Sequence, residues 1–415
     1  MKFLEDLAAR RRFGMKPGLD SIRALCATLG DPQRGFRSVH VAGTNGKGAV
    51  CALVDASLRS AGFHTGRYTS PHLVKINERF FLDGIPVDDS CLERIAEQVG
   101  EAVGGADITF FEALTAVAFL LYHETAVDFA VLECGLGGRL DATNICEPVV
   151  SVITRIGLDH CDWLGDTVEQ IAAEKAGIIR PGVPVVLGCN VESVVEVVRH
   201  RAEGLGAPFH YAPDLASESE IPSGFALHGS FNVENAITAI ASLKVLTGGF
   251  SADLADGFTR VVWPGRFQRI GRFVVDGAHN PPAALALASA VAALPLYERE
   301  SISLVAGFCG DKDVDDVLSI LAPMVTKGFA VQTNNPRSLT AGETAAKMRS
   351  HGLSSVACDT LHDALEQASE GSSLVLICGS LFLAGEALVE LGAYPWDSSR
   401  FDPSEMFKPS CGNLA

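Results

Sequence analysis

The stretch SVHVAGTNGKG, residues 38–48, predicts a buried strand that runs into a glycine-rich loop and then into a helix. Apolar residues such as Val50 and Val54 recur at helical spacing behind the loop, so we expect this helix over about residues 47–59. Glycines let a backbone approach phosphate oxygens closely, a helix start supplies amide donors, and Lys47 can neutralise phosphate charge. The stretch therefore predicts a phosphate-binding loop on an α/β sheet.

Short β-rich runs alternate with helical patterns outward from this loop, which is typical of a parallel sheet flanked by helices. In the first series we expect strands over residues 127–132, 149–153 and 184–187 and helices over residues 111–122 and 167–176. In a second series we expect strands over residues 273–275, 302–306, 328–332, 355–358 and 374–378 and helices over residues 282–294 and 342–350. The predicted fold class is α/β: an N-terminal P-loop-type, mostly parallel sheet domain and a smaller, C-terminal Rossmann-like α/β domain.

The length and the two series favour two domains. Pro264-Gly265 is the expected hinge, so we place the boundary between residues 1–266 and residues 267–415. The tail from about Tyr394 has no periodicity, and we expect it to be an extension that passes from ordered to frayed.

The composition is that of a globular protein with an acidic surface. Of the 415 residues, 47% are hydrophobic and 20% are charged, and the formal net charge is −17. Nucleic acids and anionic membranes bind basic surfaces, so neither is expected as a partner, whereas local cations still permit a small anionic substrate. Eleven scattered cysteines without a C-x-x-C pair indicate reduced thiols, and no apolar run is long enough to cross a bilayer. We therefore expect a cytoplasmic protein.

The residues after the loop lysine raise the question of what holds a magnesium ion. Gly48 and Ala49 follow Lys47 where a phosphate loop commonly has a serine or threonine hydroxyl. Magnesium requires oxygen ligands, and open α/β sheets bind ligands past the carboxyl ends of their strands. Candidates in such places are Ser70, Glu133, Asp159 and His160. Each also has a plain structural interpretation, as a turn former, a helix-cap partner or a hydrogen-bonded histidine, and only their convergence on one edge favours a metal.

Seven motifs in order along the chain resemble one family. They are VAGTNGKG (residues 41–48), TSPHL (69–73), FFE (110–112), LGGRLDATN (136–144), LDH (158–160), EKAG (174–177) and DGAHNP (276–281). Together they resemble the folylpolyglutamate synthase/dihydrofolate synthase family, which belongs to the Mur ligase superfamily. The matching residues run from about residue 14 to residue 313, so the resemblance covers most of the chain.

The resemblance implies an ADP-forming amide ligase. In that family ATP phosphorylates a carboxylate, and the amine of L-glutamate then attacks the acyl phosphate. It implies ATP and Mg²⁺ as cofactors, with two metal ions, and dihydropteroate, reduced folates and L-glutamate as small-molecule substrates. A monomer is the plain expectation. Phosphoryl transfer of this kind needs positioning and charge neutralisation more than a protein nucleophile.

The resemblance also implies roles for individual residues in catalysis and in nucleotide and metal binding. The ATP contacts would be Asn45, Gly46, Lys47, Gly48, Asn235, Arg266 and Asp276, and the metal ligands Ser70, Glu133 and His160. Lys47, His160 and Lys175 would be catalytic, and Lys175 matches a lysine that is often carbamylated to N6-carboxylysine. Without the resemblance, Lys175 would be interpreted as a solvated helix charge and Asn235 as a helix-face polar residue. Ala49 departs from the family, and we expect activity to survive because Ser70 supplies the hydroxyl there.

Two further substrate sites follow from the resemblance. The pterin contacts would be Gly14, Met15, Lys16, Phe110, Phe111, Glu112, Ala113, Arg139, Leu140 and Asp141. Aromatic faces and a carboxylate suit a flat ring with amino and amide donors, although core packing is the alternative for the two phenylalanines. The Phe-Phe-Glu form resembles members with dihydrofolate synthase activity. Because a dicarboxylate needs cationic partners, His279, Lys312 and Arg337 are the candidates for glutamate.

Three alternatives remain at this point. A folylpolyglutamate synthase without dihydropteroate activity fits the same motifs. A cell-wall Mur ligase would need a UDP-binding domain, and the 42 residues before Gly43 are too few for one. A nucleotide-gated interaction protein would need neither the Phe-Phe-Glu motif nor the segment from Asp276 to Asn280.

Overall fold

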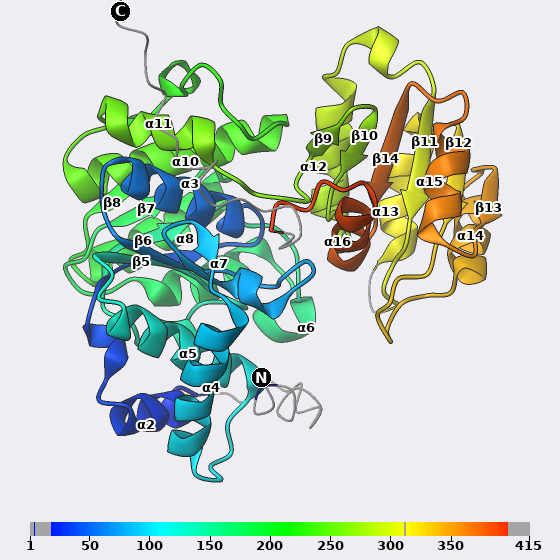
Figure 1. Ribbon diagram of the computed structural model, residues 1–415. Coiled ribbons are helices and arrows are strands. Elements are labelled where there is room, and N and C mark those ends of the chain that lie inside the picture. Colours follow the sequence, from blue (N-terminus) through cyan, green and yellow to red (C-terminus); the bar gives the residue numbers. More distant parts are fainter. Residues whose placement is uncertain (1–3, 5–17, 311–312, 397–415) are drawn as a thin grey trace, which may run out of the picture.

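The computed structural model describes residues 4, 18–310 and 313–396, which form two α/β lobes (Figure 1). An eight-stranded sheet lies in the first lobe and a six-stranded sheet in the second. This confirms the predicted fold class. The boundary at residue 266/267 stays a prediction, although the second sheet begins with Gln268.

The first sheet is mostly parallel, in the order β4-β3-β2-β5-β1-β6-β7-β8. Its strands are β1 (Arg37–Ala42), β2 (Thr65–Tyr68), β3 (Phe80–Leu82), β4 (Ile85–Pro86), β5 (Phe129–Glu133), β6 (Pro148–Ile153), β7 (Val185–Leu187) and β8 (Phe209–Tyr211). Only β3 and β4 run antiparallel to their neighbours. β1 pairs with β5 on one side and β6 on the other, so the glycine loop leaves the middle of the sheet.

Helices cover both faces of this sheet (Figure 1). On one face, α3 (Lys47–Ser60), α10 (Ser230–Thr247) and α11 (Ala252–Arg260) share an apolar core with β1, β5 and β6. On the other face, α2 (Asp20–Thr28), α4 (Asp89–Val103) and α5 (Phe110–Glu124) form one cluster, and α7 (Val168–Lys175) and α8 (Glu192–Gly204) form a second. Two short helices, α6 (Cys161–Leu164) and α9 (Ala212–Leu215), complete the lobe.

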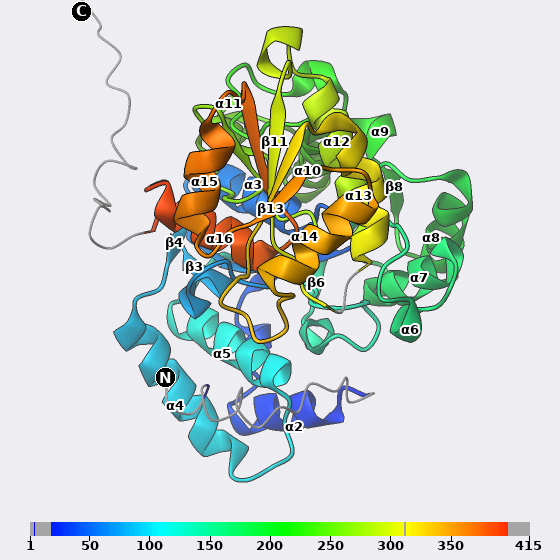
Figure 2. The same cartoon turned by 90° about the vertical axis from the view of Figure 1, so that its right-hand side faces the viewer.

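The second sheet has the order β13-β12-β11-β14-β10-β9. Its strands are β9 (Gln268–Ile270), β10 (Phe273–Val275), β11 (Ile302–Ala306), β12 (Lys327–Ala330), β13 (Ser355–Ala357) and β14 (Leu374–Cys378), and only β9 is antiparallel. The helices α12 (Pro281–Ala292), α13 (Val314–Leu321) and α14 (Ala341–Ser350) cover one face. The other face carries α15 (Leu361–Ser369) and α16 (Leu381–Glu390), as Figure 2 shows.

The predicted elements agree with the observed ones to within a few residues. The strand expected from Val127 begins two residues later, at Phe129. Val127 instead donates its N–H to Tyr122 O at 3.2 Å and so closes the end of α5. The strands β2, β3, β4, β8 and β9 and the helices α2, α4, α6, α8, α9, α10, α11, α13, α15 and α16 were not predicted.

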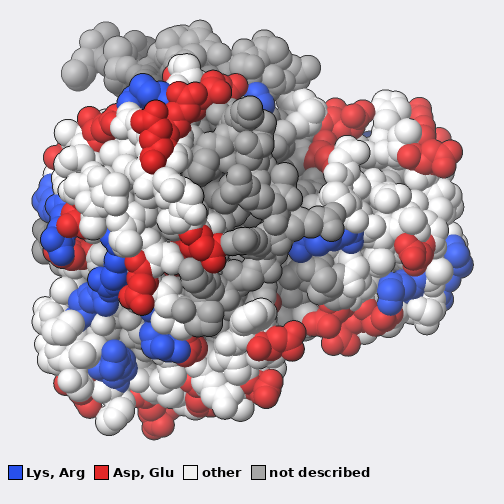
Figure 3. Space-filling view, turned by 90° about the horizontal axis from the view of Figure 1, so that it is seen from below, with Lys and Arg blue, Asp and Glu red and all other residues white. Residues whose placement is uncertain are grey.

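Two surface properties bear on possible partners. Within the described ranges, no helix is long and apolar enough to cross a membrane. Seen from below, acidic and basic side chains lie interspersed over the described parts of both lobes (Figure 3). The net negative charge is therefore not gathered into one patch on that face.

Candidate active site

The candidate site lies at the carboxyl edge of the first sheet. The neighbouring strands β2, β5, β1 and β6 end there side by side, because the sheet order places them next to each other. Ser70 follows β2, Glu133 ends β5, the glycine loop follows β1, and Thr154 follows β6. Topology alone therefore gathers groups that lie far apart in the sequence.

The glycine loop is closely packed, which explains two of its glycines. Gly43 has φ of 152°, and a Cβ there would lie 1.8 Å from Thr154 Oγ1. Gly46 has φ of 87°, and a Cβ there would lie 2.1 Å from Asn235 Oδ1. Thr154 Oγ1 also donates to Asn45 O at 2.7 Å. A side chain at either position would clash with Thr154 or Asn235, so the backbone itself forms the wall of the site.

Not every amide of the loop is available to a phosphate. The N–H groups of Thr44 and Asn45 both donate to Arg155 O, at 2.9 and 3.2 Å. The first N–H groups of a helix, by contrast, have no acceptor within it, and α3 begins at Lys47. An anion would therefore be met by the N–H groups of residues 46–48, by the positive end of the helix, and by Lys47, whose Nζ is 3.1 Å from Thr44 O.

Glu133 is a buried carboxylate surrounded by cations. It is 4% exposed, and Ser70 N–H donates to its Oε2 at 2.9 Å. Burial raises the pKa of the Glu133 carboxyl, and Lys47, the Ser70 N–H, Arg266 and Arg79 offset part of that rise. A buried carboxylate at this edge of the sheet has the chemistry of a magnesium ligand, because magnesium prefers carboxylate oxygens together with waters and phosphate oxygens.

Lys175 is buried on the other side of the glycine loop. It is 3% exposed, and its Nζ donates to Gly43 O at 2.8 Å. Burial, together with the positive charge of Lys47, lowers the pKa of its amine to about 7. A large share of the amine is therefore neutral near pH 7, which is the form that can react with carbon dioxide.

A pocket lies between Lys175, Lys47 and the loop that follows β6. It is lined by Gly43, Thr44, Lys47, Cys134, Gly135, Leu136, Gly137, Asp159, His160, Leu164 and Lys175. His160 is at its rim, with the side chain 45% exposed and Nε2 3.8 Å from Asp159 Oδ1. The structure thus brings the predicted catalytic residues Lys47, Lys175 and His160 into one pocket.

The predicted metal ligands fit a magnesium ion by their chemistry. Glu133 supplies a carboxylate and Ser70 a hydroxyl, and magnesium completes such a set with waters and phosphate oxygens. Among the described residues, no three His, Cys, Asp or Glu side chains are grouped as a preformed metal site. His160 therefore stays a predicted ligand.

Arg266 and Asp276 lie where the two lobes meet. Asp276 accepts the Phe267 N–H at 2.7 Å and the Ala278 N–H at 2.8 Å. Burial raises the pKa of the Asp276 and Glu133 carboxyls, and Arg266 offsets part of the rise in both. The Arg266 guanidinium therefore lies between one carboxylate of each lobe. Asn235 is 8% exposed and faces Gly46 from α10.

The predicted pterin residues separate into exposed, half-buried and buried groups. Phe110 and Phe111 are half-buried at the start of α5, and a Cβ on Gly135 would lie 2.4 Å from the Phe111 ring. Ala113 is fully buried, so its side chain lines no surface. Gly14, Met15 and Lys16 lie outside the described residues.

The polar members of the pterin set are already engaged. Glu112 accepts the Thr109 N–H at 2.8 Å and so caps α5. Asp141 accepts the Leu136 N–H at 2.9 Å and both donors of Thr143, which fixes the loop from Gly135. Arg139 is exposed and ion-paired with Glu174, 2.9 Å apart, and the next residue, Leu140, is half-buried. Among the polar members of the set that the structure describes, only Arg139 could turn toward a ligand without breaking a buried contact.

The structure does not bring the predicted glutamate residues together. His279 follows β10, where its Nδ1 is 2.7 Å from Gly277 O, and the exposed Arg337 follows β12. The strands β14 and β11 lie between β10 and β12, which separates the strand ends by about 14 Å. Lys312 lies outside the described residues.

Sequence reasoning missed Thr154, Arg79 and Glu78. Thr154 holds Asn45 O, Arg79 is a charged neighbour of Glu133, and Glu78 binds the backbone after Ser70. Their roles depend on contacts with residues far along the chain, which no local pattern reveals.

Known proteins match both lobes. The family profile described as Mur ligase middle domain matches residues 41–188, and the one described as Mur ligase, glutamate ligase domain matches residues 265–381. The dihydrofolate synthase/folylpolyglutamate synthase of Bacillus subtilis is 33% identical over 413 residues, covering 91% of this chain and 95% of its own length.

Solved structures agree with this likeness. A structure titled E. coli FolC in complex with DHPP and ADP has a TM-score of 0.85 and 30% identity, covering 94% of this chain and 96% of that one. The bifunctional folylpolyglutamate synthase/dihydrofolate synthase of Yersinia pestis, complexed with AMPPNP and Mn ion, has a TM-score of 0.83 and 30% identity. It covers 94% of this chain and 97% of its own.

Proposed function

The chain belongs to the folylpolyglutamate synthase/dihydrofolate synthase family of Mur ligases, and we infer that it joins L-glutamate to a folate precursor or a folate while converting ATP to ADP. The observation that carries this inference is the pocket in which Lys47, Lys175 and His160 meet beside the glycine loop. The cell-wall ligase alternative is not favoured, because the relatives of this chain are folate enzymes.

The site supports transfer through an acyl phosphate. A substrate carboxylate oxygen attacks the γ-phosphorus of ATP and ADP leaves; the glutamate amine then attacks the acyl carbon, and an amide forms as phosphate and a proton leave. The chain contributes charge and orientation: Lys47 and the N–H groups of residues 46–48 meet the phosphate oxygens. Arg266 lies at the lobe junction, from where its guanidinium would contact the same phosphate oxygens. This contact would form as the second lobe closes onto the reacting groups.

A divalent metal would lie beside Glu133. We assign Ser70, Glu133 and His160 as its protein ligands, with magnesium as the physiological ion and ATP phosphate oxygens completing the shell. When bound, the metal neutralises charge that develops on the phosphate oxygens. Carbamylation of Lys175 would place a carboxylate in the pocket that it shares with Lys47 and His160, and we assign a second ion to that carboxylate. The neutral fraction of the Lys175 amine supports the assignment.

The acceptor substrates we propose are dihydropteroate and reduced folates. The Phe110–Glu112 segment opens α5 beside Gly135, and the half-buried Phe111 ring offers an apolar face for a flat pterin. We assign the glutamate site to the second lobe, where His279 remains the candidate nearest the junction. The domain division at residue 266/267, a monomer and a cytoplasmic location complete the proposal.

The test is a substrate-resolved assay. Purified protein is incubated with Mg²⁺, ATP and L-glutamate, and dihydropteroate or tetrahydrofolate is added in turn while ADP and product mass are followed. Products from both acceptors establish two activities, and product from tetrahydrofolate alone favours the folylpolyglutamate-only alternative. ADP release that is independent of either acceptor contradicts the ligase assignment.

Lys47→Ala is the matched loss-of-function variant. We expect its turnover to fall by about 100-fold or more, since one group that stabilises transition-state charge typically contributes that much. Lys327→Ala removes an exposed lysine at the start of β12 and serves as the control. Equal activity of the two variants would remove the role assigned to the loop lysine.

A further inference from the structure

Glu78 binds the backbone of the segment that follows Ser70. The N–H groups of Leu73, Val74 and Lys75 donate to its carboxylate at 2.7, 2.8 and 2.7 Å. A fourth donor, the phenol of Tyr394, reaches Glu78 Oε1 at 2.6 Å. The Glu78 side chain is buried, with 6% of the residue exposed. A buried carboxylate with four donors fixes the shape of the segment that supplies them.

That segment is tied to the candidate metal site at its other end. We call residues 70–75 the Ser70 loop. Ser70 N–H donates to Glu133 Oε2 at 2.9 Å, and Arg79 Nε donates to His72 Nδ1 at 2.9 Å. The Ser70 loop therefore lies between Glu133 and Glu78, and only a few residues separate the backbone groups that the two carboxylates bind.

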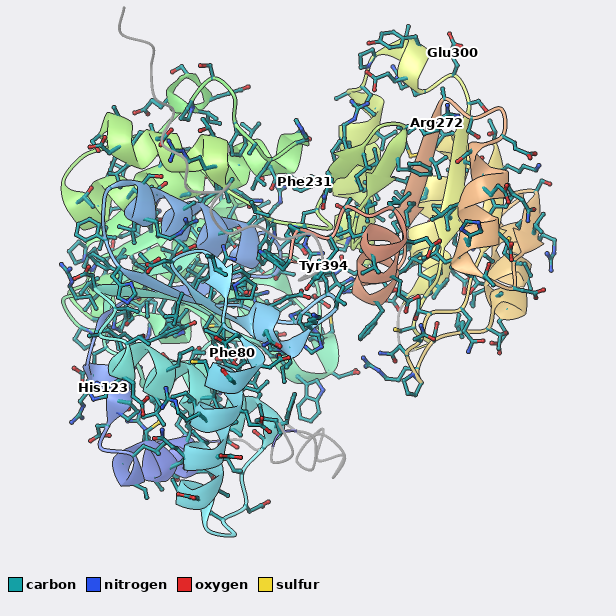
Figure 4. The ribbon with its side chains drawn as sticks, viewed as in Figure 1. Phe80, His123, Phe231, Arg272, Glu300 and Tyr394 are labelled. Carbon is teal, nitrogen blue, oxygen red and sulfur yellow. The ribbon has the colours of Figure 1, made fainter. Side chains whose placement is uncertain are left out.

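Tyr394 approaches from the opposite lobe. It follows α16 of the second lobe and lies between the two lobes in Figure 4. Its ring is 5.8 Å from that of Trp396, which in turn meets Phe81 of β3 edge-on at 5.1 Å. The chain after α16 thus crosses back onto the first sheet and carries the phenol to Glu78.

α16 itself also packs against the Ser70 loop. Leu73 belongs to the apolar cluster of the second lobe, with α15 and α16. A Cβ on Gly385 of α16 would lie 2.6 Å from Leu73 O, so the helix backbone and the loop backbone are in direct contact. The seating of the second lobe and the shape of the Ser70 loop are therefore physically coupled.

We propose that Tyr394 is a positioning residue for the metal–nucleotide end of the site: through Glu78 it holds the Ser70 loop in its binding shape while the second lobe is seated. The inference rests on the proposed function in one respect, the assignment of Ser70 to the metal. Tyr394 itself touches neither nucleotide nor metal, and it acts through the carboxylate.

Tyr394→Phe removes only the hydroxyl and leaves the ring packing with Trp396 in place. We expect the Mg²⁺ concentration for half-maximal binding of a non-hydrolysable ATP analogue to rise about three- to tenfold, because a hydrogen bond to a charged acceptor is lost. Hydrogen exchange at the amides of Leu73, Val74 and Lys75 should become faster in the unliganded variant. Tyr297→Phe, at a tyrosine 69% exposed in the same lobe, is the control and should change neither quantity.

Glu78→Gln provides a second variant. The amide keeps the size of the side chain but turns an N–H₂ group toward N–H donors, so both effects should exceed those of Tyr394→Phe. Thermal unfolding measured alongside separates a local change in the Ser70 loop from loss of the fold.

An unchanged Mg²⁺ requirement in Tyr394→Phe overturns the proposal, and so does a raised requirement without faster exchange at residues 73–75. Ser70→Ala separates this failure from that of the proposed function. If Ser70→Ala leaves the Mg²⁺ requirement unchanged, the assigned role of Ser70 fails and the proposal fails with it. If Ser70→Ala raises the requirement and Tyr394→Phe does not, only the proposal is wrong.

Discussion

The buried amine of Lys175 makes the free energy of unfolding of the protein depend on pH. Burial lowers its pKa to about 7 from 10.5, with Lys47 as a second cause. Between these two pH values the unfolded chain binds more protons than the folded chain, so the free energy of unfolding rises with pH across this window. Below pH 7 the full cost of burying the charged amine is present.

Lys175→Met should remove this pH-dependent contribution. We expect the variant to gain most in unfolding free energy relative to wild type near pH 6, and the gain should shrink steadily toward pH 10. The lost hydrogen bond to Gly43 O lowers the stability of the variant and so opposes the gain. Urea denaturation in buffers free of carbon dioxide measures the difference without carbamylation of wild type.

Lys327→Met, at the exposed lysine of β12, is the control for that series and should track wild type at every pH. A difference between Lys175→Met and wild type that stays constant from pH 6 to pH 10 would mean that Lys175 keeps an ordinary pKa in the folded chain.

At the scale of an element, α3 has a left-handed glycine at each end. Gly46 precedes the helix and Gly62 follows it, both with φ of 87°. A Cβ at Gly46 would lie 2.1 Å from Asn235 Oδ1, whereas a Cβ at Gly62 meets nothing within 4 Å. Alanine at either position carries the same backbone cost, about 1 kcal/mol.

The two alanine variants therefore separate the cost of backbone strain from the effect of a steric clash with Asn235. Gly46→Ala and Gly62→Ala should both lower thermal stability by the backbone cost, but only Gly46→Ala should displace Asn235 and weaken ATP binding. We expect at least a tenfold rise in the dissociation constant for ATP, about 1.4 kcal/mol, measured by calorimetry. Equal affinities in the two variants would show that the loop accommodates a side chain and that the Asn235 contact is dispensable.

The elements of the first sheet were predictable to different degrees. β5 is a continuous apolar run that ends in an acid, and β1 has Val39, Val41 and Ala42 directly before the glycine loop. The hydrophobic pattern and the flanking residues therefore predict both strands. β2 has the sequence TGRY, which looks like a loop. It is a strand because it pairs with β3 and β5 in the sheet. Its arginine can be buried there because Arg67 Nη1 is 3.4 Å from Asp55 Oδ2 of α3 and the guanidinium lies over the Phe81 ring. A buried charge of this kind becomes interpretable only once its partner is known.

Residues of the candidate site were likewise predictable only where the signal is local in the sequence. Glu133 could be singled out because an acid ends a buried apolar strand, and Lys47 because a lysine follows a glycine loop. Glu78 could not, since three of its donors are adjacent backbone groups and the fourth comes from Tyr394, 316 residues further along the chain. The segment from Tyr394 was expected to pass from ordered to frayed; Trp396, among its first residues, packs against Phe81 of β3, and the residues after 396 lie outside the described ones.

At the scale of the molecule, polar contacts join the two lobes near the candidate site, in addition to the Tyr394–Glu78 hydrogen bond and the packing of α16 on the Ser70 loop. Arg266 lies between Glu133 of the first lobe and Asp276 of the second, and it offsets the rise in the pKa of both carboxyls. A weaker contact joins Asn280 Nδ2 to Asp159 Oδ2 at 3.4 Å. A nucleotide bound beside Glu133 would add negative charge on the side of Arg266 that faces the first lobe. Nucleotide binding in the first lobe should therefore change the interaction of Arg266 with Asp276 of the second lobe.

Arg266→Ala should uncouple the lobes without preventing nucleotide binding. In wild type, saturating Mg²⁺–ADP should slow hydrogen exchange at the start of α3 and also across residues 276–280. In Arg266→Ala the protection of α3 should persist, because the loop amides and Lys47 remain, while protection of residues 276–280 is lost. Arg349→Ala, at an exposed arginine of α14, is the matched control and should behave like wild type. Retained protection of residues 276–280 in Arg266→Ala would instead assign the coupling to the Asp159–Asn280 contact, and a double variant at that pair would then be expected to abolish it.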